Sequence, residues 1–549
     1  TAEYTGTFEW ITAPRAAIEL GNTIENTQTT RLNFNANFVS LYNKFGFLRR
    51  VQQRGGQGIT QPGQRPVAPD VPRPPGQPEE DQPEEQDNTF EQILNGTLRV
   101  ITGFRNLSVN FTEGSGTRLP GFQPSPTFLG MNWDDMSPGA GFILGSQKDI
   151  RPQAAAGGWV TTNPMLNIPL MQNINQNLTA RSLFEPIPDL RIEFTAFRNY
   201  ARSASKFFRA NELGQFGSSN RMESGNFSIS FISFRSTFER RDARTNQSPN
   251  FRRFLDYRFQ LANQLAQNNP NWDNTNDTIT GFPTGYGPTA QEVLIPAFLA
   301  AYGGIDPGNG PLSPFLRIPL PAWRLTYDGL TNIPALQRIF QSITISHSFS
   351  STYSIGNFNS NLNFRESADG FPMMRDEMLG NFIPRYNVSQ ISISEQFRPL
   401  INIDVAWHNS LLTRLEIRTS RDIVLNFSNN QITDVTTNEV TIGTGYRFRN
   451  LALTIAQGGG RQRIQSDLVL RLNASIRTNR TVLRMIAQEV DLISSGQQVV
   501  TINASADYQL SPRVNFRFFL DRTFNNPFLS NQFVNVNTNG GISLRLMLL

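Results

Sequence analysis

Cysteine is absent from this chain of 549 residues, which excludes disulfides, thiolate nucleophiles and zinc–cysteine sites. Histidine occurs only at His347 and His408, and lysine at only three positions. Long hydrophobic runs are also missing, because the longest apolar stretch, 293–302, contains Pro296, whereas a membrane-spanning helix needs roughly 20 residues. The chain is therefore either soluble or crosses a membrane as a β-barrel, in which every second residue is apolar.

Short segments in which apolar and polar residues alternate make up much of the chain. A period of two gives each strand one dry and one wet face. Many such segments in succession predict an all-β fold, a transmembrane antiparallel β-barrel with irregular and short helical inserts. At about 9–11 residues per tilted strand, the chain offers roughly 14 to 18 strands. The clearest alternating segments are 401–408, 467–477, 500–510, 514–520 and 542–548.

Three inserts interrupt this pattern within a single domain, 1–549. We expect residues 52–87, rich in Pro and acidic residues, to form a flexible loop, because they cannot bury enough apolar area to offset their ordering entropy. Residues 119–173 form a Pro/Gly-rich insert, and 249–312 a partly helical one. Residues 391–549 return to a regular strand–turn–strand pattern that predicts barrel wall. A slip of phase at Phe231 predicts a bulge.

Neither the charge distribution nor any sequence motif favours catalysis, metal binding or nucleic-acid binding. The net charge is +5, but the arginines stand singly on polar strand faces, so we expect no nucleic-acid binding. Asp273 and Asp277 lack the spacing and the closing Glu of an EF-hand calcium loop. The adjacent aspartates at 134–135 are expected to have a structural role in a loop or a helix cap. Neither histidine has a convincing serine partner. We therefore expect no enzyme activity, no catalytic residues, no metal site and no cofactor.

Several segments together resemble the C-terminal part of the SprA (Sov) family, the giant outer-membrane translocon of Bacteroidetes gliding motility and the type IX secretion system. Leu-Tyr-Asn-Lys at 41–44 and Val-Leu-Ile-Pro-Ala-Phe-Leu-Ala-Ala-Tyr at 293–302 carry much of it. The resemblance spans nearly the whole chain. The matching segments are 38–48, 119–122, 128–130, 138–142, 285–287, 293–302, 318–330, 381–386, 391–397, 446–448 and 539–545.

The resemblance implies the C-terminal portion of a single-chain barrel of about 36 strands, in the bacterial outer membrane, that passes folded cargo proteins. It implies as partners the remaining N-terminal part of the barrel, in the same or a separate chain, a plug protein, a small shuttle barrel, secreted cargo, and lipid and lipopolysaccharide. Because the family is exported, we expect this chain to begin downstream of a removed or separate N-terminal part. The insert at 52–87 departs from the family core.

Two groups of residues are candidates for particular roles within that barrel. The first is a gating or partner-docking insert, with a space-filling element of the lumen as the alternative; its residues are Tyr286, Leu294, Pro296, Phe298 and Tyr302. The second is a terminal assembly strand that closes the barrel against its first strand; its residues are Ile542, Leu544, Leu546 and Leu548. Its end at Leu549 differs from the aromatic terminus expected of many porins.

Three other classes of protein stay open. An outer-membrane porin or uptake receptor for small solutes would be favoured by a plug with an energy-coupling segment, and none is visible. A soluble β-rich surface adhesin predicts polar outer faces on every strand. An outer-membrane enzyme such as a phospholipase needs a Ser/His pair near one rim.

Overall fold

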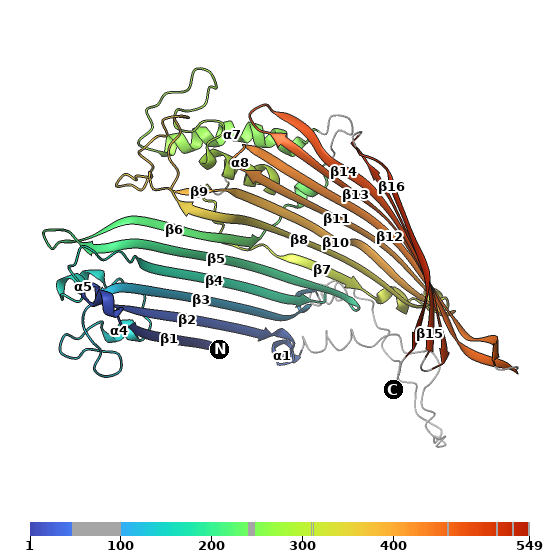
Figure 1. Ribbon diagram of the computed structural model, residues 1–549. Helices are drawn as coiled ribbons and strands as arrows, with labels where there is room; N and C mark the ends of the chain where they lie inside the picture. Colours follow the sequence, from blue (N-terminus) through green and yellow to red (C-terminus); the bar gives the residue numbers. More distant parts are fainter. Residues whose placement is uncertain are drawn as a thin grey trace, which may run out of the picture.

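One antiparallel sheet forms the body of the protein in a computed structural model (Figure 1). The structure describes residues 1–46, 100–239, 247–308, 310, 312–457, 460–511, 514–529 and 532–546. The expected loop at 52–87 and the end of the terminal strand at Leu548 lie outside these residues. The all-β antiparallel fold with irregular and short helical inserts is confirmed.

Sixteen strands belong to this sheet. Tight turns join several of them, and residues that tolerate a left-handed backbone, such as Asn430, occupy these turns. The strands are β1 (Ala2–Ile11), β2 (Asn22–Asn37), β3 (Phe104–Phe122), β4 (Leu170–Phe184), β5 (Leu190–Ala210), β6 (Phe216–Ser230), β7 (Ala322–Tyr327), β8 (Phe340–Ser360), β9 (Tyr386–Val388), β10 (Gln390–Trp407), β11 (Leu411–Asn426), β12 (Gln431–Gln457), β13 (Gly460–Met485), β14 (Val490–Ser511), β15 (Val514–Pro527) and β16 (Asn535–Leu546).

Short helices lie between strands, and two longer ones fall within the partly helical insert. Ser248 begins the longest, α7, by accepting a hydrogen bond from the Phe251 amide, with Pro249 in its first turn. Gly304, with a left-handed backbone, ends α8. The helices are η1 (Arg15–Leu20), α1 (Phe38–Tyr42), α4 (Ala140–Ile143), α5 (Arg151–Ala156), α6 (Phe234–Thr237), α7 (Pro249–Asn268), α8 (Gln291–Gly303), η2 (Gly329–Asn332) and α9 (Pro334–Gln337).

The strands follow one another in the order β1-β2-β3-β4-β5-β6-β8-β10-β11-β12-β13-β14-β15-β16. No pairing joins β1 to β16 among the described residues, so the sheet is an open, curved wall (Figure 1). Strand β7 pairs with both β5 and β8, and β9 pairs with β8. In the part of the chain that the structure describes, no helix is both long enough and apolar enough to cross a bilayer.

The sequence predicts a bulge at Phe231, but the structure shows that the chain leaves the sheet there. Strand β6 ends at Ser230 and runs between β5 and β8; β7 begins at Ala322 and continues along the same two neighbours in the same direction. The two strands thus occupy one strand position of the wall, which we call the interrupted lane because residues 231–321 separate its two pieces in the sequence. The phase slip was real, but its cause is an exit of the chain rather than one extra residue.

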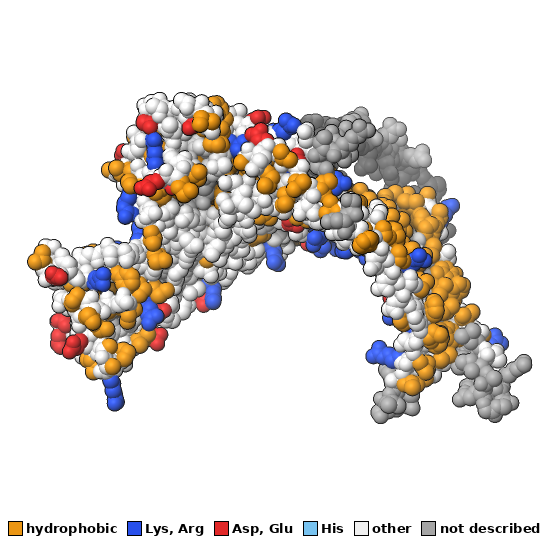
Figure 2. All heavy atoms as spheres, turned by 45° about the horizontal axis from the view of Figure 1, so that its top comes forward, with side chains coloured by type: hydrophobic (Ala, Val, Ile, Leu, Met, Phe, Trp, Pro, Cys, Tyr) orange, Lys and Arg blue, Asp and Glu red, His pale blue; other side chains and the backbone are white. Residues whose placement is uncertain are grey.

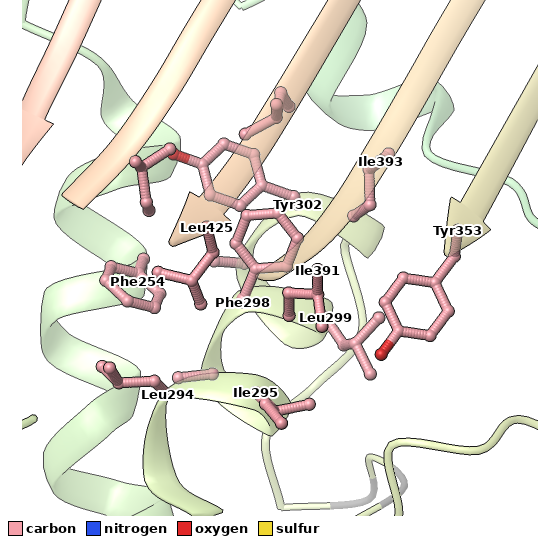
Figure 3. Close-up of a cluster of buried hydrophobic side chains, with 14 of the residues drawn as sticks. Phe254, Leu294, Ile295, Phe298, Leu299, Tyr302, Tyr353, Ile391, Ile393 and Leu425 are labelled. Atoms are coloured by element: carbon pink, nitrogen blue, oxygen red, sulfur yellow. The ribbon is translucent and has the colours of Figure 1, made fainter. Parts of the chain in front are cut away.

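The buried core lies under the inserts rather than between two sheets. The largest hydrophobic cluster joins α7 and α8 to strands β6, β8, β10, β11 and β12, with Phe298, Tyr353 and Leu425 among its members (Figure 3). A second cluster packs the residues between β3 and β4 against the first strands, around Phe142 and Ile24. Apolar burial of this kind stabilises each insert on the wall.

Candidate functional site

The strand register separates the wall into two chemically different faces. Directly paired residues of neighbouring antiparallel strands project to the same side of a sheet. One row of paired residues is apolar from β8 to β14, with Ile345, Ile403, Leu415, Ile442, Ala474 and Ile502, and turns polar at Arg522 and Thr538 on β15 and β16. The next row is polar from β8 to β16, apart from one glycine: Thr344, Asp404, Arg414, Gly443, Asn473, Asn503, Asp521 and Asn539. We call the two sides the apolar face and the polar face.

Large apolar side chains on the apolar face are exposed, as the sequence pattern predicts. Leu472 and Phe518 are each 45% exposed. In Figure 2, hydrophobic side chains gather along the right-hand leg of the arch that the protein forms. A surface of this extent needs an apolar partner. We define the apolar belt as Leu32, Phe34, Ile401, Leu415, Val440, Ile442, Leu470, Leu472, Ile476, Ile502, Phe518, Leu520, Ile542 and Leu544.

The polar face is concave. A hollow of about 610 Å³ is lined by Asp404, Arg414 and Asn473 on the polar face of the C-terminal strands. A second hollow of about 690 Å³, lined by Thr27 and Asn175 among others, lies on the same face of the N-terminal strands. Side chains of Asn, Ser, Thr and Arg dominate this surface, and these groups are compatible with water.

The helical insert packs on the apolar face. Ile423 lies eight residues along β11 from Leu415, so both side chains project from the same side. Ile423 is fully buried in the cluster that contains α8, whereas Leu415 lies in the belt. The insert therefore covers the face opposite to the polar one, and its alternative role as a space-filling element of the lumen stays a prediction.

The five candidate residues of the insert are buried. Leu294, Phe298 and Tyr302 have no exposed surface and belong to the largest cluster, and Pro296 is buried with them in α8 (Figure 3). Tyr286 belongs to a separate cluster with Phe382, at a ring distance of 5.2 Å. The structure therefore offers none of these side chains to a partner in this conformation, and their role in gating or docking stays a prediction.

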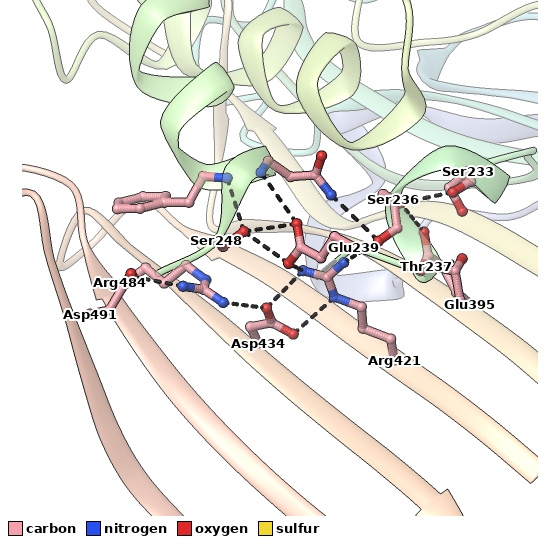
Figure 4. Close-up of polar contacts among 12 residues, drawn as sticks. Ser233, Ser236, Thr237, Glu239, Ser248, Glu395, Arg421, Asp434, Arg484 and Asp491 are labelled. Carbon is pink, nitrogen blue, oxygen red and sulfur yellow. Dashed lines mark hydrogen bonds and ion pairs between the residues drawn. The ribbon is translucent and has the colours of Figure 1, made fainter. Parts of the chain in front are cut away.

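Five charged side chains of the described residues form a buried cluster beneath the insert that the sequence did not predict. Arg421 donates hydrogen bonds to Asp434 at 2.8 and 3.0 Å and to Glu239 at 2.8 Å (Figure 4). Arg484 donates to the same Asp434 oxygen at 2.8 Å and to Asp491 at 2.7 Å. Arg421, Asp434 and Arg484 are at most 1% exposed. The cluster joins β11, β12 and β13 to the segment between α6 and α7.

These charges also order the start of α7. Glu239 accepts a hydrogen bond from the Ser248 hydroxyl at 2.9 Å and from the Asn250 amide at 3.2 Å, and Ser248 is the N-cap of α7. The Arg421 guanidinium also donates to the Ser236 carbonyl at 2.7 Å. A sequence signal existed, because Arg421 stands in phase with the apolar residues Ile423 and Leu425 of its strand.

Polar groups at the tip of the insert are held by hydrogen bonds of their own. Asp273 accepts hydrogen bonds from the Thr284 and Thr275 hydroxyls and from Arg375, and these bonds lower the pKa of its carboxyl. Burial raises the pKa of the Glu292 carboxyl, in the first turn of α8, to about 7. No group of three His, Asp or Glu side chains suited to a metal occurs among the described residues.

The two histidines and the paired aspartates lie apart from one another. His347 Nδ1 is 2.6 Å from the Leu400 carbonyl oxygen, and His408 Nε2 is 2.9 Å from that of Gln337. Among the described residues no side chain donates a hydrogen bond to Asp134 or Asp135, whose backbone amides donate to the Asn132 side-chain oxygen in a turn. The absence of an enzyme activity remains an expectation.

The terminal strand presents its apolar row to the surface. Ile542 is 67% exposed and Leu544 56%, and Leu546 at the end of β16 is 61% exposed. One edge of β16 pairs with β15. Its other edge pairs with no strand among the described residues, so its role in closing a barrel stays a prediction.

Comparisons with known proteins find no matching family model and no matching curated protein. Among solved structures, the chain is similar to OmpT, an outer membrane protein of Vibrio cholerae, at 8% identity and a TM-score of 0.17. That match covers 69% of this chain and 92% of OmpT. The RagAB peptide transporter also matches, at 8% identity and a TM-score of 0.23, over 93% of this chain and 47% of the transporter chain.

Proposed function

We propose that this chain forms part of the wall of a very large β-barrel in the bacterial outer membrane, the protein-conducting channel of a type IX secretion system. The observation that carries the proposal is the separation of the two faces along continuous rows of paired residues. The apolar belt suits contact with lipid hydrocarbon, and the concave polar face suits a hydrated passage. The sequence resemblance to the SprA family supplies the cargo class, folded proteins.

The free edges of the wall favour further strands. An unpaired edge leaves backbone N–H and C=O groups without partners, at a cost of several kcal/mol each in hydrocarbon. Strands β1 and β16 each have one such edge among the described residues. In the proposed barrel both pair with strands of the remaining wall, in the same chain or a separate one. The plug, the shuttle barrel and lipopolysaccharide come from the family resemblance alone.

The other classes of protein are less well supported. A soluble adhesin predicts polar side chains outside, whereas the belt residue Ile442 is 59% exposed beside apolar neighbours. A porin or uptake receptor shares the two-faced wall but predicts a lumen that admits only small solutes. The width of the passage therefore separates the translocon from the porin.

The absence of cysteine makes a direct test practical, since any introduced thiol is unique. Asn473→Cys places a thiol on the polar face, and Leu472→Cys places one on the apolar face of the same strand. Each variant is expressed in a secreting cell and treated with a short crosslinker that joins the introduced thiol to an amine of a neighbouring protein. We expect folded secreted proteins to be captured at position 473 and not at position 472.

Capture of whole secreted proteins at Asn473→Cys supports a protein-conducting lumen. Equal capture at both positions would contradict the assignment of the faces. If Asn473→Cys captures no protein while a small charged maleimide labels it fully, the passage is a solute pore and the secretion proposal fails.

A further inference from the structure

The hollow of about 610 Å³ on the polar face is rich in arginine. Four arginines line it, Arg414, Arg447, Arg449 and Arg471, against one carboxylate, Asp404. The volume lies within the range of sites that hold a small ligand or a short peptide segment. We call it the basic hollow, defined by these five residues.

Two glycines of β12 lie among the arginines of the hollow. Gly443 and Gly445 line the hollow from β12, on either side of Thr444, and both belong to the polar face. Gly443 is buried, and a Cβ atom added there would meet the Asn473 Oδ1 atom at 2.7 Å. A Cβ atom added at Gly445 would meet nothing closer than 3.6 Å, so this position has room for a larger residue. The depth of the hollow thus depends partly on these glycines.

The arginines of the hollow differ in their partners. Arg414 lies 3.5 Å from Asp404 and 3.2 Å from Glu416, and Arg471 lies 2.6 Å from Asp507. Arg447 and Arg449 are exposed, and neither forms an ion pair within the described ranges of the chain. The paired arginines are held in position by these carboxylates, and the other two retain their charge for a ligand.

We propose that the basic hollow binds acidic segments of polypeptides, by bidentate contacts of Arg447 and Arg449 with Asp or Glu carboxylates. A planar guanidinium matches a carboxylate with two parallel hydrogen bonds. The hollow lies on the face opposite to the apolar belt, which favours a polypeptide in the passage over a lipid headgroup. This inference rests on the proposed function, since it makes the hollow a contact point for protein cargo.

Peptide binding to the purified full-length chain in detergent tests the inference. The probe is a fluorescein-labelled hexaglutamate peptide, and its anisotropy is followed at low and high salt. We expect saturable binding that weakens as salt rises, and no saturable binding of a hexalysine peptide. Arg447→Gln with Arg449→Gln should weaken hexaglutamate binding at least tenfold, since both unpaired cations of the hollow are lost.

Matched variants distinguish binding in the basic hollow from non-specific attraction to the positive charge of the polar face. Arg477→Gln with Arg545→Gln removes the same charge from the same face outside the hollow and should change affinity less than twofold. Gly445→Leu keeps every charge but fills the hollow, and should also weaken binding at least tenfold. Equal loss in the Arg477/Arg545 control, or unchanged binding in Gly445→Leu, would overturn the site.

Two further outcomes keep the inference separate from the proposed function. Inorganic phosphate is added at a concentration that supplies as much negative charge as the peptide does. Displacement of the peptide under these conditions would show an anion site without preference for polypeptide, and would overturn the inference. Failure of the wild-type chain to bind hexaglutamate also overturns it, whatever the result of crosslinking at position 473. Absence of cargo adducts at that position overturns the channel, whatever the peptide does.

Discussion

Arginine introduced at Leu472 should impair insertion into a bilayer, while arginine at the adjacent Asn473 should not. On β13 the belt residues, with Leu468 at one end of the same row, extend to Ile476, about eight residue steps or roughly 26 Å along the strand. With a tilt of 35–45°, this corresponds to a height of about 20 Å, close to the apolar band of outer-membrane barrels. Leu472 lies at its middle, where an arginine on the lipid face costs about 2–4 kcal/mol.

The measurement is the free energy of folding of the complete barrel into lipid vesicles, from urea titrations of the wild type, Leu472→Arg and Asn473→Arg. We expect a loss of about 2–4 kcal/mol for Leu472→Arg and less than about 1 kcal/mol for Asn473→Arg. Ile502→Arg, on the paired strand β14, should behave like Leu472→Arg. The loss should shrink for Leu468→Arg at the end of this row. Equal effects at 472 and 473, or no dependence on position along β13, would refute the membrane placement.

Two further predictions concern the helical insert. Asp434→Asn leaves the buried Arg421 and Arg484 without their shared carboxylate and should cost about 3–5 kcal/mol, measured as faster hydrogen exchange in α7. Glu439→Gln, at a partly exposed ion pair of 3.8 Å, should cost less than about 1 kcal/mol. Similar exchange in both variants would contradict the prediction. Burial raises the pKa of Glu292 to about 7, so the folded insert binds a proton more tightly than the unfolded chain does. The free energy of unfolding of the insert should therefore fall by about 3 kcal/mol as pH rises from about 4.5 to 7. Glu292→Gln should remove this fall. The measurement is hydrogen exchange of α8 as a function of pH, corrected for intrinsic rates. Exchange that depends on pH equally in the variant and the wild type would show that another group is responsible.

Much of the wall could be predicted from the sequence because period-two alternation is a local property. The alternation at 401–408 and 467–477 assigns each side chain to a face before any pairing is known, and the register confirms those faces. Strand boundaries are not reported by alternation: the segment 542–548 covers only part of β16, which begins at Asn535. Boundaries depend on turns and neighbouring strands, which local alternation does not report.

The packing of the inserts could not be predicted in the same way. Helical spacing in 249–312 indicates helices, but not the face of the wall that they cover. That choice depends on contacts between α8 and strands such as β11, which are more than a hundred residues away in sequence. The basic hollow was equally hidden, since its arginines come from three strands and appear one at a time in the sequence.

The interrupted lane formed by β6 and β7 has a consequence for the order of assembly. Strand β8 aligns with both pieces of this lane, and residues 231–321 separate these pieces along the chain. Contacts between residues far apart in sequence form slowly, because the intervening chain must first lose its freedom. The seam between β5 and β8 should therefore be among the last parts of the wall to close, which would make it the weakest point of a newly inserted barrel.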